Sequence, residues 1–433
     1  MNLFQEMGLP DQLVRKLGNM GITDPTPIQS HAIPHALNGH DVMGLAQTGT
    51  GKTAAFGLPL LAQLVEMRAK PRPKAVLSLI LAPTRELANQ IKDTLMPLVK
   101  DTPIKIGVVV GGSSINVQMK RLEKGTHILV ATPGRLLDLL DRRAMHLDDA
   151  QFLVLDEADQ MLDLGFIHAL RKIANLIPAE RQTMLFSATM PKQMEEIAAS
   201  YLKHPKRVQV NPPGKAADKI TQSVHFIAKA EKPSLLIELL DKHREERALV
   251  FGRTKHGSDK LAKKLESAGF KVATIHGNKS QGQRERALKA FRDAEVKILV
   301  ATDVAARGLD IPDVKHIYNF ELPNVPENYV HRIGRTARAG KDGAAIAFCA
   351  PDEMGELKDI QKAMGISIPV ASGRPWVDLP DPKGKPKGRG GPRRGGRPQG
   401  GGKPGGGKPG GPGGGQRKRR RSGGGGKPRA QAA

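Results

Sequence analysis

Cysteine is almost absent from this sequence, which has one cysteine, Cys349, among its 433 residues. A single cysteine excludes an intramolecular disulfide and a zinc site built from cysteines, and it is typical of a reducing compartment. Long apolar segments are also absent, because runs such as 75–82 fall far short of the roughly 18 residues of a membrane-spanning helix. Residues 1–10 contain no apolar core of a secretion signal. We therefore expect a cytoplasmic protein with no membrane association.

Acidic residues are few relative to basic ones. The chain has 68 Lys and Arg residues and 43 Asp and Glu residues, a formal net charge of +25. Residues 381–433 hold 16 basic residues and one acidic residue, so this segment carries +15 and residues 1–380 carry +10. The segment contains 21 Gly and 8 Pro, and apart from proline it has no apolar side chain larger than alanine. It therefore cannot form a core. We expect a disordered polycation that binds nucleic acid, with RNA favoured, through phosphates. A merely solubilising tail is the alternative.

Upstream of this segment, short apolar runs alternate with amphipathic helical patterns. The expected strands are 41–46, 76–82, 104–110, 127–131, 152–155 and 183–186, then 222–228, 248–251, 272–275, 297–301, 316–320 and 344–348. Such alternation predicts βαβ units and mostly parallel sheets with helices on both faces. The sequence therefore predicts an α/β protein with two tandem parallel-sheet domains at 1–210 and 220–370, a linker at 211–219 and a disordered tail at 371–433.

A glycine-rich loop, AQTGTGKT at 46–53, follows the first expected strand and resembles a Walker A phosphate loop. Small residues in such a loop let backbone N–H groups approach phosphates at the N-terminus of a helix. Lys52 is expected to reach the β and γ oxygens of a nucleotide, and the hydroxyl of Thr53 to ligate Mg²⁺. The other expected nucleotide contacts in the loop are Gln47, Thr48, Gly49, Thr50 and Gly51. The general pattern has glycine where this chain has Ala46.

Two carboxylates, Asp156 and Glu157, directly follow the apolar strand expected at 152–155. In a site that hydrolyses a nucleotide, Asp156 would hold Mg²⁺ and Glu157 would polarise the attacking water. An acidic start of a helix is the alternative, but the Walker A loop upstream favours the catalytic interpretation.

The segment HRIGRTAR at 331–338 offers the positive charge that phosphoryl transfer needs from outside the loop. Its arginines, Arg332, Arg335 and Arg338, are three residues apart, which predicts that they share one face of a helix. A solvated basic helix end is the alternative.

Eight segments resemble, in order, the motifs of the DEAD-box RNA helicases. They are 21–29, 46–53, 83–88, 132–135, 156–159, 187–189, 301–311 and 331–338. The resemblance spans about residues 4–350. The compact core and the basic Gly-rich tail resemble the bacterial RhlE-like subgroup. The family resemblance implies two RecA-like domains, the cofactors ATP and Mg²⁺, and RNA as the partner.

The resemblance also implies roles for individual residues. Phe4, Gln29 and Asp310 would contact the nucleoside, Arg335 and Arg338 would be arginine fingers, and Ser187, Thr189, His331 and Arg332 would couple the ATP and RNA sites. The RNA path would be lined by Arg85, Gly112, Thr132, Arg135, Arg253, Gly277, Thr302 and Arg307. Two alternatives stay open: Phe4 as a core residue, and Gly112 and Gly277 as turn residues.

The function expected from this resemblance is that of an ATP-dependent RNA helicase. ATP and RNA would close the two domains, bend one strand and open a short duplex or remodel an RNA–protein complex. One alternative is a DNA-translocating helicase of the same superfamily. Another is an ATP-gated RNA clamp or annealing chaperone. Ribosomal or RNA-decay complexes are the candidate partners beyond RNA itself.

Overall fold

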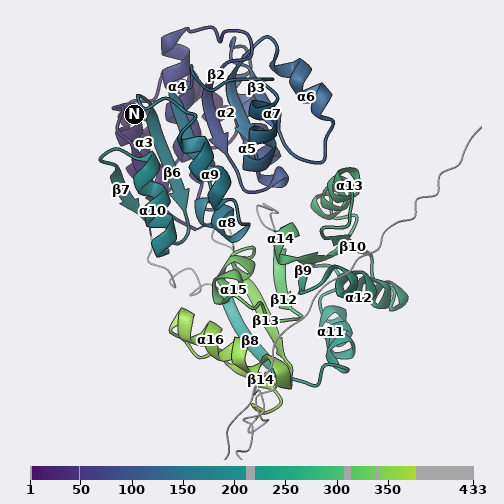
Figure 1. Cartoon of the computed structure of the whole chain (residues 1–433). Coiled ribbons are helices and arrows are strands. Elements are labelled where there is room, and N and C mark those ends of the chain that lie inside the picture. Colours follow the sequence, from purple (N-terminus) through teal and green to yellow (C-terminus); the bar gives the residue numbers. More distant parts are fainter. Residues whose placement is uncertain (1, 48, 211–219, 307–313, 338–341, 377–433) are drawn as a thin grey trace, which may run out of the picture. The chain divides into compact units, whose positions relative to one another are not determined.

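The computed structural model describes residues 2–47, 49–210, 220–306, 314–337 and 342–376 (Figure 1). Within these ranges the chain forms two seven-stranded sheets, in which all strand pairs are parallel. The predicted tandem α/β architecture is thus confirmed. The expected linker 211–219 and most of the expected tail lie outside the described residues.

The first sheet has the strand order β3-β4-β2-β5-β6-β1-β7. Its strands are β1 (Val42–Leu45), β2 (Val76–Leu81), β3 (Ile106–Val109), β4 (Thr126–Ala131), β5 (Phe152–Leu155), β6 (Gln182–Ser187) and β7 (Lys206–Gln209). The residues of β2, β4, β5 and β6 are buried throughout, which explains why these strands are continuous apolar runs in the sequence.

Helices cover both faces of this sheet (Figure 1). One face packs against α1 (Leu3–Glu6), α2 (Asp11–Asn19), α3 (Pro27–Leu37), α4 (Lys52–Met67) and α5 (Arg85–Val99). The other packs against α6 (Ile115–Leu122), α7 (Pro133–Asp141), α8 (Ala158–Asp163), α9 (Ile167–Ala174) and α10 (Lys192–Tyr201). Neighbouring strand residues alternate between the two cores: Ile80 belongs to the first, Leu79 and Leu81 to the second. This is the period-two alternation of a strand buried on both sides.

The second sheet has the order β10-β11-β9-β12-β13-β8-β14. Its strands are β8 (Ile220–Phe226), β9 (Arg247–Gly252), β10 (Val272–Ile275), β11 (Ile298–Thr302), β12 (Val314–Asn319), β13 (Gly343–Cys349) and β14 (Val370–Ser372). This order repeats that of the first sheet, with β8 to β14 in the places of β1 to β7, so the two domains share one topology.

Helices also cover both faces of the second sheet. The helices α11 (Lys232–Asp241) and α12 (Lys255–Ser267) cover one face. The other face is covered by α13 (Gln281–Arg292), α14 (Asp303–Ala306), α15 (Pro326–Ile333) and α16 (Met354–Met364), the last preceded by the 3₁₀ turn Pro351–Glu353. The thiol of Cys349 lies in this core, where burial raises its pKa to about 12. A thiol buried in apolar surroundings has little thiolate and is chemically inert.

Two strands were not expected from the sequence, β7 and β14. The second bears on the start of the tail, which was expected at residue 371. Val370 and Ser372 instead pair with β8, and the indole Nε1 of Trp376 donates a hydrogen bond to the carbonyl of Cys349 at 3.2 Å. Residues 371–376 therefore pack with the second sheet. Among the described residues, no helix has the length and apolar composition needed to cross a membrane.

Candidate functional site

The loop between β1 and α4 has the backbone geometry of a phosphate-binding turn. Gly49 and Gly51 have φ angles of 85° and 90°, in the left-handed region that glycine adopts at little cost. A Cβ at Gly51 would lie 2.4 Å from the side-chain nitrogen of Gln29, so a larger residue there would displace that amide. The hydroxyl of Thr50 donates to the carbonyl of Gln47 at 2.8 Å and closes the turn. Thr48 lies outside the described residues.

Gln29 joins this loop to helix α3. Its amide nitrogen donates to the carbonyl of Gly51 at 3.1 Å, and its amide oxygen accepts the N–H of Thr26 at 3.0 Å. The second bond belongs to a capping box at the start of α3. One donor and one acceptor position of the amide remain for an adenine edge. Phe4 is fully buried in the core, as its alternative interpretation stated, and whether it also contacts a nucleoside stays a prediction.

Lys52, the first residue of α4, and Glu157 present opposite charges that are both buried. Their exposed fractions are 5% and 2%, and among the described residues neither Lys52 Nζ nor either carboxylate oxygen of Glu157 has a hydrogen-bond partner. Buried ionic groups in folded proteins are normally paired. The pattern fits a site whose partners are a bound phosphate for the lysine and a polarised water for the carboxylate.

Asp156 and Glu157 lie at the carboxyl end of β5, before α8. The backbone of Glu157 has φ 49°, an unusual conformation for a non-glycine residue, and its N–H donates to Asp156 Oδ1 at 3.0 Å. Burial raises the pKa of Asp156 to about 7; Lys52 opposes this shift, and the charge of Glu157 adds to it. A bound divalent cation would offset the cost of burying the ionised carboxylate, and it would hold Asp156 in the ionised form. The carboxylate of Asp156 and the half-buried hydroxyl of Thr53 are oxygen donors of the type Mg²⁺ prefers.

Asp159, two residues after Glu157, is the centre of a hydrogen-bonded cluster. Its Oδ2 accepts the N–H of Ala188 at 3.2 Å and both the N–H and the hydroxyl of Thr189 at 2.9 and 3.0 Å. Its own N–H donates to the hydroxyl of Ser187 at 3.3 Å. The structure thus brings both predicted coupling hydroxyls to Asp159, that of Thr189 to its carboxylate and that of Ser187 to its backbone N–H. We assigned Asp159 no role from the sequence. The available signal was its place as the third acidic residue of the motif at 156–159.

The predicted RNA residues of the first domain lie at the carboxyl ends of its strands. Gly112 has φ 74°, and a Cβ there would lie 1.9 Å from Arg85 Nη1, so the guanidinium packs directly on the glycine. Burial lowers the pKa of Arg85. Arg135 donates to the carbonyl of Ser113 at 3.0 Å, and Thr132 is the N-cap of α7. Arg85, Gly112 and Arg135 therefore belong to one neighbourhood around residues 111–113.

The arginine segment of the second domain differs from the expectation of one continuous helical face. Helix α15 ends at Ile333, and Gly334 caps it, so Arg335 lies in the following turn. Arg332 is 2% exposed and makes a bidentate ion pair with Asp303 at 2.5 and 2.8 Å. Arg335 is 4% exposed and donates to the carbonyl of His331 at 3.2 Å. Arg338, Arg307 and Asp310 lie outside the described residues.

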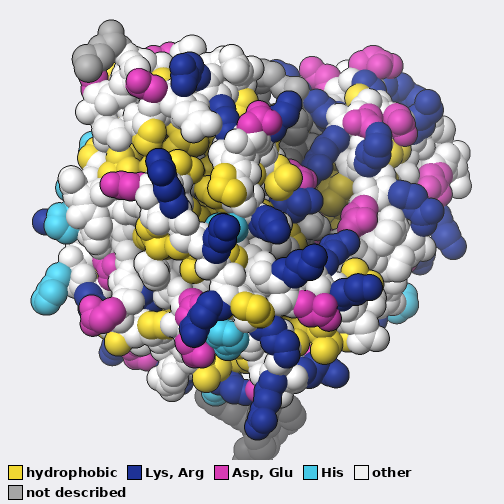
Figure 2. Space-filling model, turned by 90° about the horizontal axis from the view of Figure 1, so that it is seen from above, with side chains coloured by type: hydrophobic (Ala, Val, Ile, Leu, Met, Phe, Trp, Pro, Cys, Tyr) yellow, Lys and Arg dark blue, Asp and Glu magenta, His cyan; other side chains and the backbone are white. Residues whose placement is uncertain are grey.

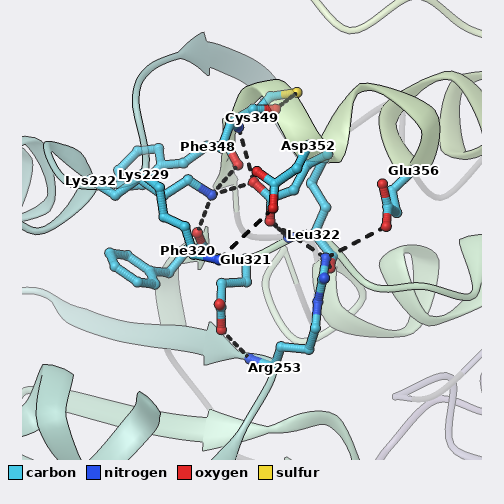
Figure 3. Close-up of polar contacts among 12 residues, drawn as sticks. Lys229, Lys232, Arg253, Phe320, Glu321, Leu322, Phe348, Cys349, Asp352 and Glu356 are labelled. Carbon is cyan, nitrogen blue, oxygen red and sulfur yellow. Dashed lines mark hydrogen bonds and ion pairs between the residues drawn. The ribbon is translucent and has the colours of Figure 1, made fainter. Parts of the chain in front are cut away.

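The remaining predicted RNA residues follow three neighbouring strands. Thr302 ends β11, Gly277 lies just beyond β10, and Arg253 follows β9. Among the described residues, and apart from the two chain neighbours of Gly277, no atom lies within 4 Å of a Cβ placed on this glycine. Its φ is not left-handed either, so neither feature requires glycine there. Arg253 is part of a buried charge network that sequence reasoning missed (Figure 3). Its Nη2 donates to the carbonyl of Leu322 at 2.9 Å.

One further group of potential metal ligands, His243, Glu246 and His316, lies near the amino ends of β9 and β12. The imidazole rings stack with centroids 4.2 Å apart and planes 25° apart. Rings in this arrangement must rotate before both in-plane lone pairs can point at one ion. The group is unconnected with the residues expected to hold Mg²⁺.

Comparisons with known proteins match both domains. The model of the DEAD/DEAH box helicase family matches residues 26–197, and that of the helicase conserved C-terminal domain matches residues 231–340. The chain is 44% identical over 362 residues to the DEAD-box ATP-dependent RNA helicase CshA of Bacillus cereus, a match that covers 84% of this chain and 68% of that protein.

Two solved structures have the same fold over most of their length. S. cerevisiae Dbp5 bound to RNA and ADP BeF3 is 32% identical with a TM-score of 0.76, and covers 86% of this chain and 95% of its own. The DEAD-box helicase Mss116 bound to ssRNA and UDP-BeF is 30% identical with a TM-score of 0.78. That match covers 87% of this chain and 81% of the Mss116 chain.

Proposed function

Because this chain belongs to the DEAD-box family of ATP-dependent RNA helicases, we propose that it hydrolyses ATP at the loop that contains Lys52 and uses the cycle to open short RNA duplexes. The observation that carries the proposal is the pair of buried and unpartnered charges, Lys52 Nζ and the carboxylate of Glu157. They lie beside Asp156, whose pKa burial raises to about 7. Perturbed ionisable groups of this kind mark sites of chemistry.

Different residues of the first domain would bind the phosphates, Mg²⁺, the attacking water and the adenine. Lys52 and the N–H groups at the start of α4 would bind the β and γ phosphates, and Thr53 and Asp156 would hold Mg²⁺. Bound Mg²⁺ supplies positive charge that offsets the charge of the phosphates. Glu157 would orient and polarise the attacking water. Gln29 would select adenine with the donor and acceptor that its amide retains.

The second domain would complete this site when ATP and RNA draw the domains together. Arg335, with Arg338, would stabilise the charge of the transferring phosphoryl group. Because both ligands favour the closed arrangement, each would raise the affinity for the other by the same factor. His331 and Arg332 would communicate that arrangement, as Ser187 and Thr189 would in the first domain.

RNA would be read through its backbone. The side chains of Arg85, Arg135 and Thr132, with Gly112 as a close-approach position, suit phosphates and 2′-hydroxyls. Arg307, Thr302 and Gly277 would continue the path in the second domain. The residues of 1–380 carry a net charge of +10, and Figure 2 shows Lys and Arg side chains spread over the visible face with Asp and Glu among them. Such a surface favours polyanions without selecting a base sequence.

Strand separation measured on matched RNA and DNA duplexes tests the proposal against a DNA helicase. The full-length protein should open a short RNA duplex in the presence of ATP and should leave the DNA duplex paired. Equal opening of DNA would contradict RNA specificity. Annealing measured without ATP tests the chaperone alternative: if annealing persists at its full rate while ATP-dependent opening is absent, the helicase proposal is wrong. A cytoplasmic role in ribosomal or RNA-decay complexes stays a prediction.

A further inference from the structure

The loop between β12 and α15, residues 320–325, is held at several successive peptide groups (Figure 3). The carbonyl of Phe320 accepts from Lys232 Nζ at 2.9 Å, and the carbonyl of Glu321 accepts from Arg332 Nη1 at 2.6 Å. The N–H of Leu322 donates to Glu353 Oε1 at 3.1 Å, and its carbonyl accepts from Arg253 Nη2 at 2.9 Å. Loops are usually more mobile than the elements they connect, whereas side chains from other segments hold the backbone of this loop, and Leu322 is fully buried.

Two of these ties come from a buried ion pair, Lys232 with Glu353. Their exposed fractions are 1% and 4%, and the two groups are in direct contact. Lys232 Nζ also donates to the carbonyl of Phe348 at 3.0 Å, and Glu353 Oε2 accepts the N–H of Ala350 at 2.9 Å. The pair therefore joins the carboxyl ends of β12 and β13. A buried pair carries a desolvation penalty, and here both charges also satisfy backbone groups of the loop and the strand end.

Arg253, which directly follows β9, also contacts the loop and the residues around Glu353. Its guanidinium lies 3.5 Å from Glu353 and 3.8 Å from Glu356, in addition to its bond with the carbonyl of Leu322. Its backbone N–H donates to Glu321 Oε2 at 2.6 Å. The side chain is 33% exposed. Nη2 thus contacts the loop and two carboxylates of its own domain. Charge-assisted contacts of this kind are strong and directional, so the guanidinium can fix the loop relative to these carboxylates.

The loop leads directly into α15, which begins at Pro326. Arg332 in this helix is bonded both to the loop, at Glu321, and to Asp303. Arg335 follows the helix and is bonded back to it, at the carbonyl of His331. The chain from Phe320 to Arg335 is therefore one continuous, hydrogen-bonded path whose starting point is fixed by Lys232, Arg253 and Glu353.

We propose that Lys232, Glu353 and Arg253 are positioning residues that fix the β12–α15 loop and thereby place Arg335 for ATP hydrolysis. On this proposal the Arg253 side chain serves the loop instead of an RNA phosphate. The inference rests on the proposed function in one respect, the role of Arg335 as an arginine finger. Its structural part, that the network holds the loop, is independent of that role.

Arg253→Met in the full-length protein is the principal test. Methionine removes the guanidinium but keeps most of the aliphatic side chain, so this partly exposed position should lose little packing. Amide hydrogen exchange without ATP or RNA should be faster in residues 320–325 and unchanged in β9. The kcat of RNA-stimulated ATP hydrolysis should fall about tenfold, since small displacements of catalytic groups have effects of this size or larger. The KM for RNA should stay within about twofold, as expected where no phosphate contact is removed.

Two further variants separate positioning from folding. Lys232→Met combined with Glu353→Gln removes both charges, which is far milder than leaving one of them buried alone, and it should reproduce the loop exchange and the loss of kcat. Lys242→Met is the matched control, because Lys242, the C-cap of the helix α11 that begins at Lys232, forms an exposed pair with Glu238. It should leave exchange, kcat and KM unchanged.

Three results would overturn the proposal. Unchanged exchange in residues 320–325 of Arg253→Met would show that the network does not hold the loop. Faster exchange with a normal kcat would show that the loop does not place the finger. A raised KM for RNA with a normal kcat would make Arg253 an RNA contact. Arg335→Ala is measured in parallel: a normal kcat there contradicts the finger assignment of the proposed function, while the exchange data still decide the structural part.

Discussion

The carboxylate oxygen Oδ2 of Asp159 accepts two hydrogen bonds from Thr189, one from its N–H at 2.9 Å and one from its hydroxyl at 3.0 Å. Asp159 follows β5 and Thr189 follows β6, so the bonds join the segments beyond two neighbouring strands. One of these segments also contains Glu157, the residue we expect to orient the attacking water. A change in the nucleotide site therefore has a direct hydrogen-bonded route to the segment after β6.

Thr189→Val should separate ATP hydrolysis from strand opening. Valine keeps the shape of threonine but removes the hydroxyl that donates to Asp159 Oδ2, while the backbone bond remains. We expect ATP hydrolysis within about threefold of wild type, because only one of the three neutral donors to Asp159 Oδ2 is lost. The number of duplexes opened per ATP hydrolysed should fall about tenfold. Thr189→Ser, which keeps a hydroxyl, is the control. An unchanged ratio for the valine variant would refute the coupling role.

Gly112→Ala should weaken RNA binding, whereas Gly277→Ala should not. A Cβ at Gly112 would overlap Arg85 Nη1 at 1.9 Å, and alanine is strained at φ 74°. The guanidinium must move from the place where we expect it to meet a phosphate. The KM for RNA in the ATPase assay should rise about tenfold. Gly277 has open space around it, and its alanine variant should match wild type within about twofold. Equal effects at both positions would disprove the distinction.

His127 should make the first domain less stable as the pH falls below about 6.5. Its Nδ1 accepts the N–H of Lys105 at 3.2 Å, a bond that protonation abolishes. Burial lowers the pKa of His127, and the charge of Lys105 lowers it further. The folded state thus binds the proton less readily than the unfolded state, so the stabilisation is complete above the unfolded pKa and is lost as the pH falls through the folded one.

His127→Asn is the comparison that isolates this group, because an asparagine oxygen can accept the same N–H without titrating. Denaturant unfolding at pH 7.5 and pH 5.5 should give a larger loss of stability for wild type than for the variant. The same loss in both proteins would show that other groups account for the pH dependence.

Deletion of residues 381–433 should weaken RNA binding and reduce its dependence on salt. The segment carries a net charge of +15, and each phosphate neutralised by a bound protein adds close to one unit to the slope of log affinity against log salt. RNA affinity measured from about 50 to 200 mM salt should show a smaller slope for the shortened protein. An identical slope would leave only a solubilising role for the segment.

The parallel strands of both domains were predictable because burial on two faces produces apolar runs such as β2 and β4. The strand β7, Lys206–Gln209, was not, because only Val208 among its four residues is buried. The strand β14 is exposed at all three positions, so its three residues, VAS, show no alternation between a buried and an exposed face. Edge strands of this kind are fixed by pairing with a neighbour, which a single sequence does not reveal.

The positions of the glycine-rich loop after β1 and of Asp156 after β5 were predictable, because each segment is encoded in neighbouring residues. Their roles stay predictions. The single helical face predicted for Arg332 and Arg335 was wrong, because Gly334 ends α15 before the second arginine. Arg338 lies outside the described residues. The pair Lys232 and Glu353 left no signal, since its members are 121 residues apart and each resembles an ordinary surface charge. Only the fold brings such residues together.

The most direct test of the whole account is RNA-stimulated ATP hydrolysis by Lys52→Ala in the full-length protein. Lys52 is buried at the start of α4 with no hydrogen-bond partner among the described residues, so its loss should leave folding intact and remove the charge that binds the phosphates. We predict that kcat/KM for ATP falls at least about a hundredfold, with an unchanged melting temperature in the absence of nucleotide. Wild-type hydrolysis by this variant would contradict the assignment of the site.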